Sequence, residues 1–351
     1  MYKKCDSRQF LLPGVGYKFY QGYKMSASKR FFHDVKTELK PWTNENFGGS
    51  ADSDEFNFII FGDRAGRPLA DVTKDAIAKI NLLNPDFVMS VGDFISGCCY
   101  EDYSPGFIQR QWDDFENMLK ECEPPFFRVV GNHDIPSQTE DGGVLAHAHD
   151  MQTKLWEKQF GATYYSFVFK DVLFICLHTM EIFMDISETQ LEWARETLQK
   201  HSDVKWTMVF GHLPKAWDMP NWEKLADILD DRNYTVFAGD FHNYVRCRRR
   251  GRNYYIIGMT GTESQHAGYP PKGVYYGEFQ SLTWVSFKNG EPQLSLLALD
   301  EVYNDDVVTI PKLTWLTPSY FQADQPISAE EADKLEAKGL KIHREIGEYY
   351  L

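Results

Sequence analysis

The hydrophobic positions of this chain form short apolar runs that alternate with segments of helical periodicity. After about residue 54, the run FNFIIFGD predicts a buried strand, and FVMSVGD and PFFRVVGNHD predict two more. The segment after the first strand places its apolar residues at the spacing of one helix face: Val72, Ala76, Ile77, Ile80 and Leu83. Strands that alternate with helices in this way indicate an α/β fold.

The alternation continues through the second half of the chain. TYYSFVFKDVLFICLH is typical of two strands around a turn at Lys170 and Asp171. The helix predicted for SETQLEWARETLQKH begins with Ser187 and Gln190 in capping-box spacing. KWTMVFGH and YTVFAGD predict further strands, with a helix between them. The basic cluster RCRRRGR lies between two strand-like runs, so we interpret it as a solvated hairpin turn.

Composition narrows the classes of protein. Of the 351 residues, 43% are hydrophobic and 15% aromatic, which is enough to fill a large core. The net charge of −14 argues against nucleic-acid binding, which depends on Lys and Arg neutralising phosphates. No run of 18 apolar residues predicts a membrane span, and the N-terminal sequence is a poor signal peptide. Six cysteines without a CxxC pair indicate reduced thiols, so we expect a cytoplasmic protein.

Candidate chemistry gathers where the apolar strands end. Five of them finish in glycine followed by polar residues, which are Asp63, Asp93, Asn132 with Asp134, His212, and Asp240 with His242. Ligands of open α/β sheets bind outside the carboxyl ends of strands, and glycine lets the backbone approach them closely. Turn residues explain one or two such endings, but five in order form a constellation.

Metal binding is the chemistry that these residue types share. Carboxylate, amide and imidazole groups suit divalent first-row metals, and the lack of thiolates disfavours a structural zinc site. Three clustered aspartates repel one another unless a cation offsets their charge. The set is large enough for two metal ions with one bridging carboxylate, an arrangement that stabilises displacement at phosphorus.

The motif order GD, GD, GNHD, GH and GDFH resembles the calcineurin-like metallophosphoesterase superfamily over about residues 56–300. GNHD is the most specific element, and DRAG after the first strand resembles a bacterial branch. The resemblance implies an α/β fold in which two mixed β-sheets pack as a sandwich flanked by α-helices. It also implies a dinuclear metal site at one edge of the sheets. Residues 1–54 would then be an N-terminal extension and linker, 55–301 the catalytic domain, and 302–351 a C-terminal extension.

The resemblance also implies a role for each motif residue. Asp63 and His242 would hold the first metal, and Asp93 would bridge. Asn132, His212 and Asp240 would hold the second. The ions would be Mn, Fe or Zn, with Mg as an alternative, and a metal-bound hydroxide would attack phosphorus.

His133 would protonate the leaving oxygen, with Asp134 orienting it. His133 is also supported by its own context, because it is flanked by metal-site residue types and a histidine is the simplest general acid near neutral pH. The alternative is an ordinary loop histidine.

Two positions depart from the family pattern. Ala65 stands where the first motif usually has histidine, which should weaken the first metal site. Asp240 stands where the last motif usually has histidine, which makes the second site harder and favours Mn²⁺, Fe²⁺ or Mg²⁺.

Three further residues are candidates for substrate binding. Arg64 beside the first ligand has a guanidinium suited to a phosphate oxygen, although a surface salt bridge is an alternative. His178 ends a strand and would line the cleft, unless it is structural. His266 lies in a glycine-rich segment that we expect to be a substrate loop.

Three functions follow from these observations. We favour a dinuclear-metal-dependent hydrolase of small phosphate mono- or diesters. The alternatives are a scaffold that has kept the fold and lost the chemistry, which Ala65 supports, and a nuclease, which the net charge of −14 opposes. The sequence leaves the oligomeric state open.

Overall fold

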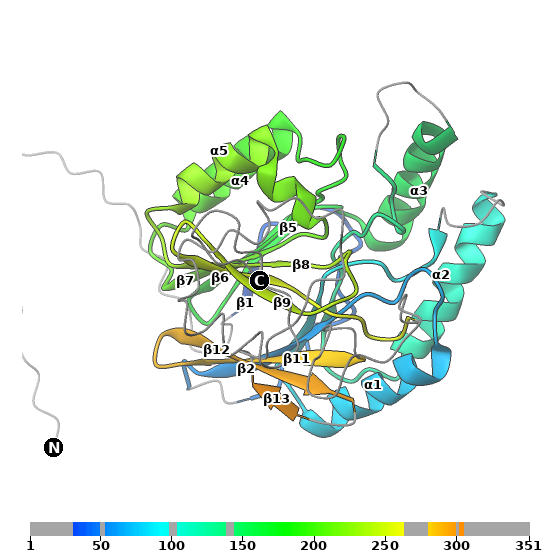
Figure 1. Cartoon of the computed structure of the whole chain (residues 1–351), viewed down its shortest axis with the longest axis horizontal. Helices are drawn as coiled ribbons and strands as arrows, with labels where there is room; N and C mark the ends of the chain where they lie inside the picture. Colours follow the sequence, from blue (N-terminus) through cyan, green and yellow to red (C-terminus); the bar gives the residue numbers. More distant parts are fainter. Residues whose placement is uncertain are drawn as a thin grey trace, which may run out of the picture.

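Two mixed β-sheets pack face to face, and helices cover their outer sides (Figure 1). This computed structural model describes residues 31–49, 53–97, 104–137, 144–262, 280–299 and 302–304. Within these residues, the first sheet has seven strands, in the spatial order β1 (Phe31–His33), β5 (Tyr165–Phe169), β6 (Val172–Cys176), β7 (Trp206–Phe210), β8 (Tyr234–Ala238), β10 (Arg252–Ile256) and β9 (Val245–Arg249). The second sheet has six, in the order β13 (Val302–Asn304), β12 (Glu291–Ala298), β11 (Ser281–Lys288), β2 (Phe56–Phe61), β3 (Phe87–Ser90) and β4 (Phe126–Phe127).

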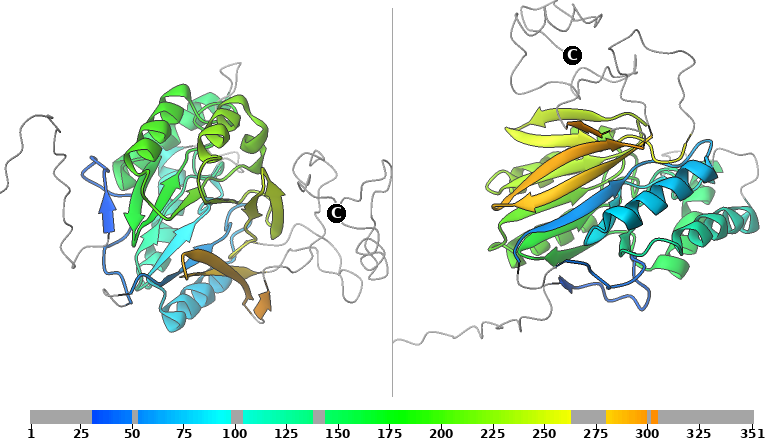
Figure 2. Two further views of the ribbon diagram at one scale, coloured as in Figure 1. Left: turned by 90° about the vertical axis from the view of Figure 1, so that its left-hand side faces the viewer. Right: turned by 90° about the horizontal axis from the view of Figure 1, so that it is seen from below.

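Helices lie on both outer sides of this sandwich. In chain order they are α1 (Ala70–Leu83), α2 (Pro105–Leu119), α3 (Val144–Phe160), α4 (Glu188–Lys200), the 3-10 helix η2 (Pro214–Asp218) and α5 (Pro220–Leu229). Figures 1 and 2 show α1 beside the sheet that contains β2, and α4 and α5 on the far side of the other sheet. The predicted fold class is therefore confirmed. No helix among the described residues is both long enough and apolar enough to cross a membrane.

The strand β2 shows why both faces of the sheets are apolar. Phe58 and Ile60 join the core between the two sheets, whereas Ile59 and Phe61 join the core beneath the helices. Successive side chains of a strand point to opposite faces, so a strand covered on both sides reads as one continuous apolar run.

The two predicted hairpins are present. Lys170 and Asp171 join β5 to β6, and both have positive φ, as a two-residue primed turn requires. Arg250 and Gly251 join β9 to β10 in the same way. The guanidinium of Arg250 pairs with carboxylates of α5 and the turn after it, so this part of the basic cluster is neutralised locally.

Described parts of the two predicted extensions contribute to the sandwich. In the N-terminal one, β1 pairs antiparallel with β5, and Trp42 is buried with its ring 5.3 Å from that of Phe127. In the C-terminal one, β13 pairs with β12.

The sheet topology explains where a site forms. β2, β3 and β4 are parallel, and so are β6, β7 and β8. The segment after β10 connects the two groups, because the Gly258 carbonyl accepts a hydrogen bond from Asp63 N and the Asp63 carbonyl accepts one from Thr260 N. The carboxyl ends of strands from both sheets therefore meet at Asp63.

Candidate metal centre

Asp63, Asp93 and His212 form the centre of the site. Each offers one ligand atom, and these atoms lie within 4.8 Å of one another. All three side chains are buried. Asp63 follows β2 and Asp93 follows β3, whereas His212 follows β7 of the other sheet. The cluster is therefore built from both halves of the sandwich.

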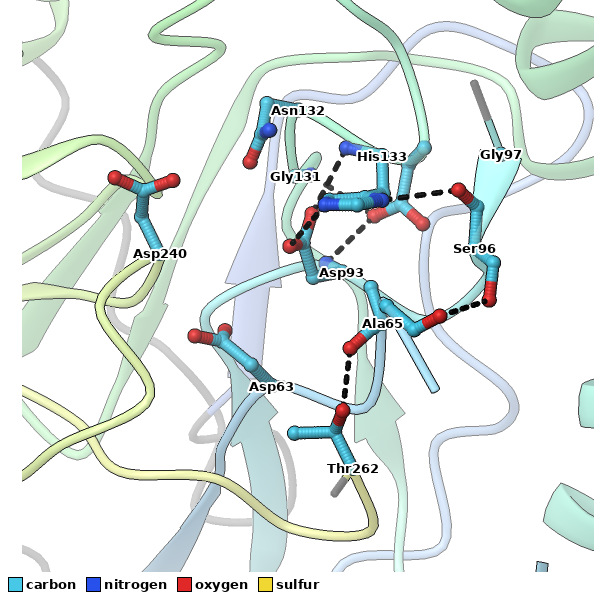
Figure 3. Close-up of polar contacts among 12 residues, drawn as sticks. Asp63, Ala65, Asp93, Ser96, Gly97, Gly131, Asn132, His133, Asp240 and Thr262 are labelled. Carbon is cyan, nitrogen blue, oxygen red and sulfur yellow. Dashed lines mark hydrogen bonds and ion pairs between the residues drawn. The ribbon is translucent and has the colours of Figure 1, made fainter. Parts of the chain in front are cut away.

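The other three predicted metal ligands lie around this cluster, and Figure 3 shows two of them, Asn132 and Asp240, near Asp63 and Asp93. The Asn132 Oδ1 atom lies 2.7 Å from Nε2 of His212. The Asp240 Oδ1 atom lies 4.0 Å from the same nitrogen. Nε2 of His242 lies 4.0 Å from an oxygen of Asp63. The structure thus brings all six predicted ligands together.

The carboxylate of Asp63 is the group that most needs a cation. It is fully buried, and neither oxygen has a hydrogen-bond partner among the residues that the structure describes. Burial raises the pKa of Asp63 well above its ordinary value. A buried carboxylate without a partner is costly, and a metal ion at its oxygens would remove that cost. The residues present therefore fit a metal ion.

The imidazole of His212 is oriented as a metal ligand. Its Nδ1 lies 2.6 Å from the Val91 carbonyl, which can only accept, so Nδ1 carries a proton. Its Nε2 faces acceptor oxygens of Asn132 and Asp93, the latter at 3.3 Å. Burial alone would lower the pKa of His212, but the carboxylates, with Asp93 foremost, raise it to about 10. Nε2 therefore requires either a proton or a metal ion.

His133 lies at the edge of the cluster, where Figure 3 shows its ring beside Asp93. Its backbone N–H donates to Asp93 Oδ1 at 2.9 Å, and its Nε2 lies 3.8 Å from the other oxygen of that carboxylate. Its Nδ1 lies 2.9 Å from the Ser96 carbonyl, so this nitrogen is a donor. Nε2 is thus the ring nitrogen that faces the cluster.

Asp134 has a different position from the one we expected. Its two oxygens accept backbone N–H groups from Asp93, Phe94, Ile95 and Gly131 at 2.8–3.3 Å. These bonds connect the loop after β3 to the loop after β4. We expected Asp134 to orient the His133 ring, and the Ser96 carbonyl is a group that bonds directly to its Nδ1.

At two glycines, the backbone passes so close to a predicted ligand that no larger residue would fit. A Cβ atom at Gly131 would lie 2.2 Å from Asp93 Oδ1, and one at Gly239 would lie 2.4 Å from Asp63 Oδ1. Three predicted ligands, Asp93, Asp240 and His242, have φ values of 64°, 70° and 55°. Left-handed backbone is uncommon for such residues and concentrates at functional sites.

Ala65, at the position of the missing histidine, is fully buried. Its carbonyl accepts a hydrogen bond of 2.6 Å from the Thr262 hydroxyl. An alanine side chain has no ligand atom, so only Asp63, Asp93 and His242 remain of the side chains that the family pattern would place at a first metal ion.

Two of the predicted substrate-binding residues, Arg64 and His178, lie in the protein interior. The guanidinium of Arg64 is buried, donates to the Phe94 carbonyl at 2.6 Å and lies over the ring of Phe115. The ring of His178 is 2% exposed and stacks on that of His149. Both side chains therefore pack into the interior. His266 lies outside the described residues.

The sequence analysis missed groups that hold the ligands in place. The carbonyls of Val91 and Ser96 orient His212 and His133, but a backbone carbonyl leaves no sequence signal. The Thr179 hydroxyl accepts the backbone N–H of His212 at 3.2 Å and of Leu213 at 3.0 Å. Its one possible signal is its place just after a strand, beside His178.

The calcineurin-like phosphoesterase model matches residues 56–245, which is more than half of the chain. The chain belongs to this family. It is 22% identical over 280 residues to mouse (Mus musculus) tartrate-resistant acid phosphatase type 5, a match that covers 67% of this chain and 83% of that protein. The family indicated by GNHD is thereby confirmed.

Solved structures share the fold of this phosphoesterase-family chain. The purple acid phosphatase PPD1 from yellow lupin (Lupinus luteus) seeds aligns with a TM-score of 0.55 at 15% identity, over 76% of this chain and 57% of the lupin chain. The structure of PhoD aligns with a TM-score of 0.52 at 9% identity, over 74% of this chain and 73% of that chain. This chain thus spans less than two thirds of the lupin enzyme.

Proposed function

We propose that this protein is a hydrolase of small phosphate mono- or diesters that uses two metal ions. The observation that carries the proposal is the buried carboxylate of Asp63, which lies beside Asp93 and His212 with no hydrogen-bond partner in the described part of the chain. Family membership and the acid phosphatase relative support the same reaction class.

Asp63 and His242 would hold one metal ion, Asn132, His212 and Asp240 the other, and Asp93 would bridge. When bound, divalent ions supply Lewis acidity, which activates water and offsets the charge of the phosphoryl group. Four of these six side chains would coordinate a metal through oxygen, so we infer a preference for Mn²⁺ or Fe²⁺, with Mg²⁺ and Zn²⁺ as the ions to compare.

His133 is the general acid in this proposal. The Ser96 carbonyl holds its Nδ1, and the proton on Nε2 is the one directed toward the cluster. The transfer of this proton neutralises the oxygen of the leaving group as its bond to phosphorus breaks. General acid catalysis of this kind contributes about 10²–10⁴-fold to a rate.

Two alternatives make different predictions. A scaffold that has lost the chemistry is supported by Ala65 but opposed by the convergence of six donor side chains. A nuclease is opposed by the net charge of −14. Cleavage of single-stranded DNA with a steep salt dependence would favour the nuclease.

The test begins with metal-depleted protein to which Mn²⁺, Fe²⁺, Zn²⁺ or Mg²⁺ is added. We expect metal-dependent hydrolysis of p-nitrophenyl phosphate or bis(p-nitrophenyl) phosphate, and its loss in Asp93→Ala. His133→Ala should lose about 10²–10⁴-fold on an alkyl ester such as glycerol phosphate. The matched controls are the exposed residues Asp231 and His147, whose alanine variants should keep the full rate. Full activity in Asp93→Ala or His133→Ala would remove the proposal.

A further inference from the structure

The backbone around His133 lies against the short loop that follows Asp93. Nδ1 of His133 bonds to the Ser96 carbonyl, and a Cβ atom at Gly97 would lie 1.8 Å from the His133 carbonyl oxygen. The loop from Ser96 to Gly97 and the backbone of His133 are therefore in direct contact. Any shift of this loop moves the acceptor that fixes the ring of His133.

Gln111 of α2 holds the loop from one side. Its Oε1 accepts the backbone N–H of Ser96 at 3.0 Å and of Gly97 at 3.2 Å. Gln111 is half-buried and follows one helical turn behind Phe107. A single side-chain oxygen thus fixes the peptide group that contains the carbonyl bonded to His133, and the peptide group before it.

Gln152 of α3 holds the backbone of His133 and Asp134. It is 1% exposed, and its amide nitrogen donates to the carbonyls of His133 at 3.2 Å and of Asp134 at 2.9 Å in the orientation that satisfies both. The two helices pack together, since the rings of Trp112 and Trp156 lie 5.6 Å apart. Gln111 therefore acts as an acceptor and Gln152 as a donor, on adjoining backbone segments.

We propose that Gln111 and Gln152 are positioning residues for His133. Gln111 holds the carbonyl that binds Nδ1, and Gln152 holds the backbone that carries the ring, so together they direct Nε2 toward the cluster. The inference rests on the proposed function, because it assigns these glutamines to the general acid. Neither glutamine acts on the substrate itself.

Esters with good and poor leaving groups distinguish a loss of His133 positioning from a general loss of activity. An ester with a very good leaving group, such as 2,4-dinitrophenyl phosphate, needs little protonation, whereas glycerol phosphate depends on it. In Gln111→Met, which keeps the shape but removes the acceptor, we expect kcat to fall about tenfold or more on glycerol phosphate and less than about threefold on 2,4-dinitrophenyl phosphate. Gln111→Glu keeps an acceptor oxygen and should restore the rate.

At position 152, in contrast to position 111, substitution by glutamate should not restore the rate. Neither methionine nor glutamate can donate a hydrogen bond, so Gln152→Met and Gln152→Glu should both show the selective loss on glycerol phosphate. The matched control is Gln109→Met, which removes an α2–α3 contact with Gln159 without touching the loop. Equal losses on both esters in Gln111→Met, or the same selective loss in Gln109→Met, would overturn the inference.

A second readout does not depend on turnover. Hydrogen exchange of the His133 Nδ1–H, followed by ¹⁵N NMR at one pH in metal-free protein, reports its bond to the Ser96 carbonyl. We expect exchange at least about tenfold faster in Gln111→Met than in wild type or Gln109→Met. Unchanged exchange would reject the positioning role. If wild type hydrolyses no ester with any metal, the proposed function fails, while this exchange measurement still decides whether the glutamines hold His133.

Discussion

The carboxylate of Asp63 lies fully buried at the junction of the two sheets, and its oxygens have no hydrogen-bond partner within the described ranges. Asp63→Asn removes the charge with little change of shape. We expect the metal-free variant to unfold at the same or a higher temperature than metal-free wild type, because its buried group carries no charge.

The same variant should lose part of the stabilisation that added Mn²⁺ gives to wild type, because Asp63 is a proposed ligand of only one of the two ions. Thermal unfolding with and without metal measures both effects. The exposed Asp231→Asn is the control and should behave as wild type. A metal-induced shift in Asp63→Asn as large as that of wild type would contradict the role of Asp63.

The burial of His178 leads to a prediction about how the free energy of unfolding depends on pH. Burial, and then the neighbouring His149, lower the pKa of His178 to about 3. An unfolded chain binds this proton near pH 6.5, so the unfolded state gains protons first and stability is lost as the pH falls below 6.5. Between pH 6.5 and 5, His178 should account for a loss of about 2 kcal/mol.

His178→Phe should remove this contribution. Urea unfolding at both pH values measures it, as the difference between wild type and variant. The exposed His147→Phe should retain the wild-type dependence. An equal fall in stability for wild type and His178→Phe would show that His178 does not stay neutral in the folded protein.

At this scale, the sequence predicted which polar side chains converge, but not how every side chain is oriented. Motif residues such as Asn132 and His212 are visible because their types and spacing carry the chemistry. The direction in which a side chain points is set by packing, so the sequence could not show that Arg64 and His178 are buried in the interior. Ser96 contributes through its carbonyl, which is independent of its side chain.

Among the elements, the loops after β3 and β4 depend on Asp134. Its carboxylate accepts four backbone N–H groups from the two loops, at distances of 2.8–3.3 Å. Asp134→Ala would leave these donors without an acceptor. We expect the free energy of unfolding to fall by about 2–5 kcal/mol, as measured by urea denaturation.

Asp134→Asn provides the graded comparison. Its amide keeps one acceptor oxygen, so its loss of stability should lie between those of wild type and the alanine variant. An alanine variant as stable as wild type would contradict the anchoring role.

The elements that sequence predicted well are those with local causes. The hairpin turns at Lys170–Asp171 and Arg250–Gly251 follow from short-range patterns, and the cap of α4 forms where Ser187 accepts the N–H of Gln190. β1 could not be predicted as part of the sheet, because its partner β5 lies more than 130 positions further along the chain. A short strand owes its existence to such a partner and not to its own sequence.

Across the whole molecule, the site joins the two sheets. The ligands Asp63, Asp93 and Asn132 follow strands of one sheet, and His212, Asp240 and His242 follow strands of the other. Metal ions bound by both sets would connect the halves of the sandwich. Removal of metal with a chelator should therefore lower the unfolding temperature of wild type.

The size of the stabilisation by metal depends on the ratio of the metal concentration to Kd. At a metal concentration of 100 times Kd, one bound ion stabilises the folded state by about 2.7 kcal/mol. The unfolding temperature of wild type should rise with metal concentration, and this rise should be smaller in Asp63→Asn, which keeps the ligands proposed for the other ion. Identical unfolding of wild type with metal and with chelator would contradict a site shared by the sheets.

The most direct test of the central claim is the metal content of each purified chain after reconstitution and removal of free ions. We predict about two metal ions per wild-type chain and fewer than one in Asp93→Asn, which loses the bridging carboxylate. A wild-type chain that retains no more metal than Asp93→Asn would contradict the account.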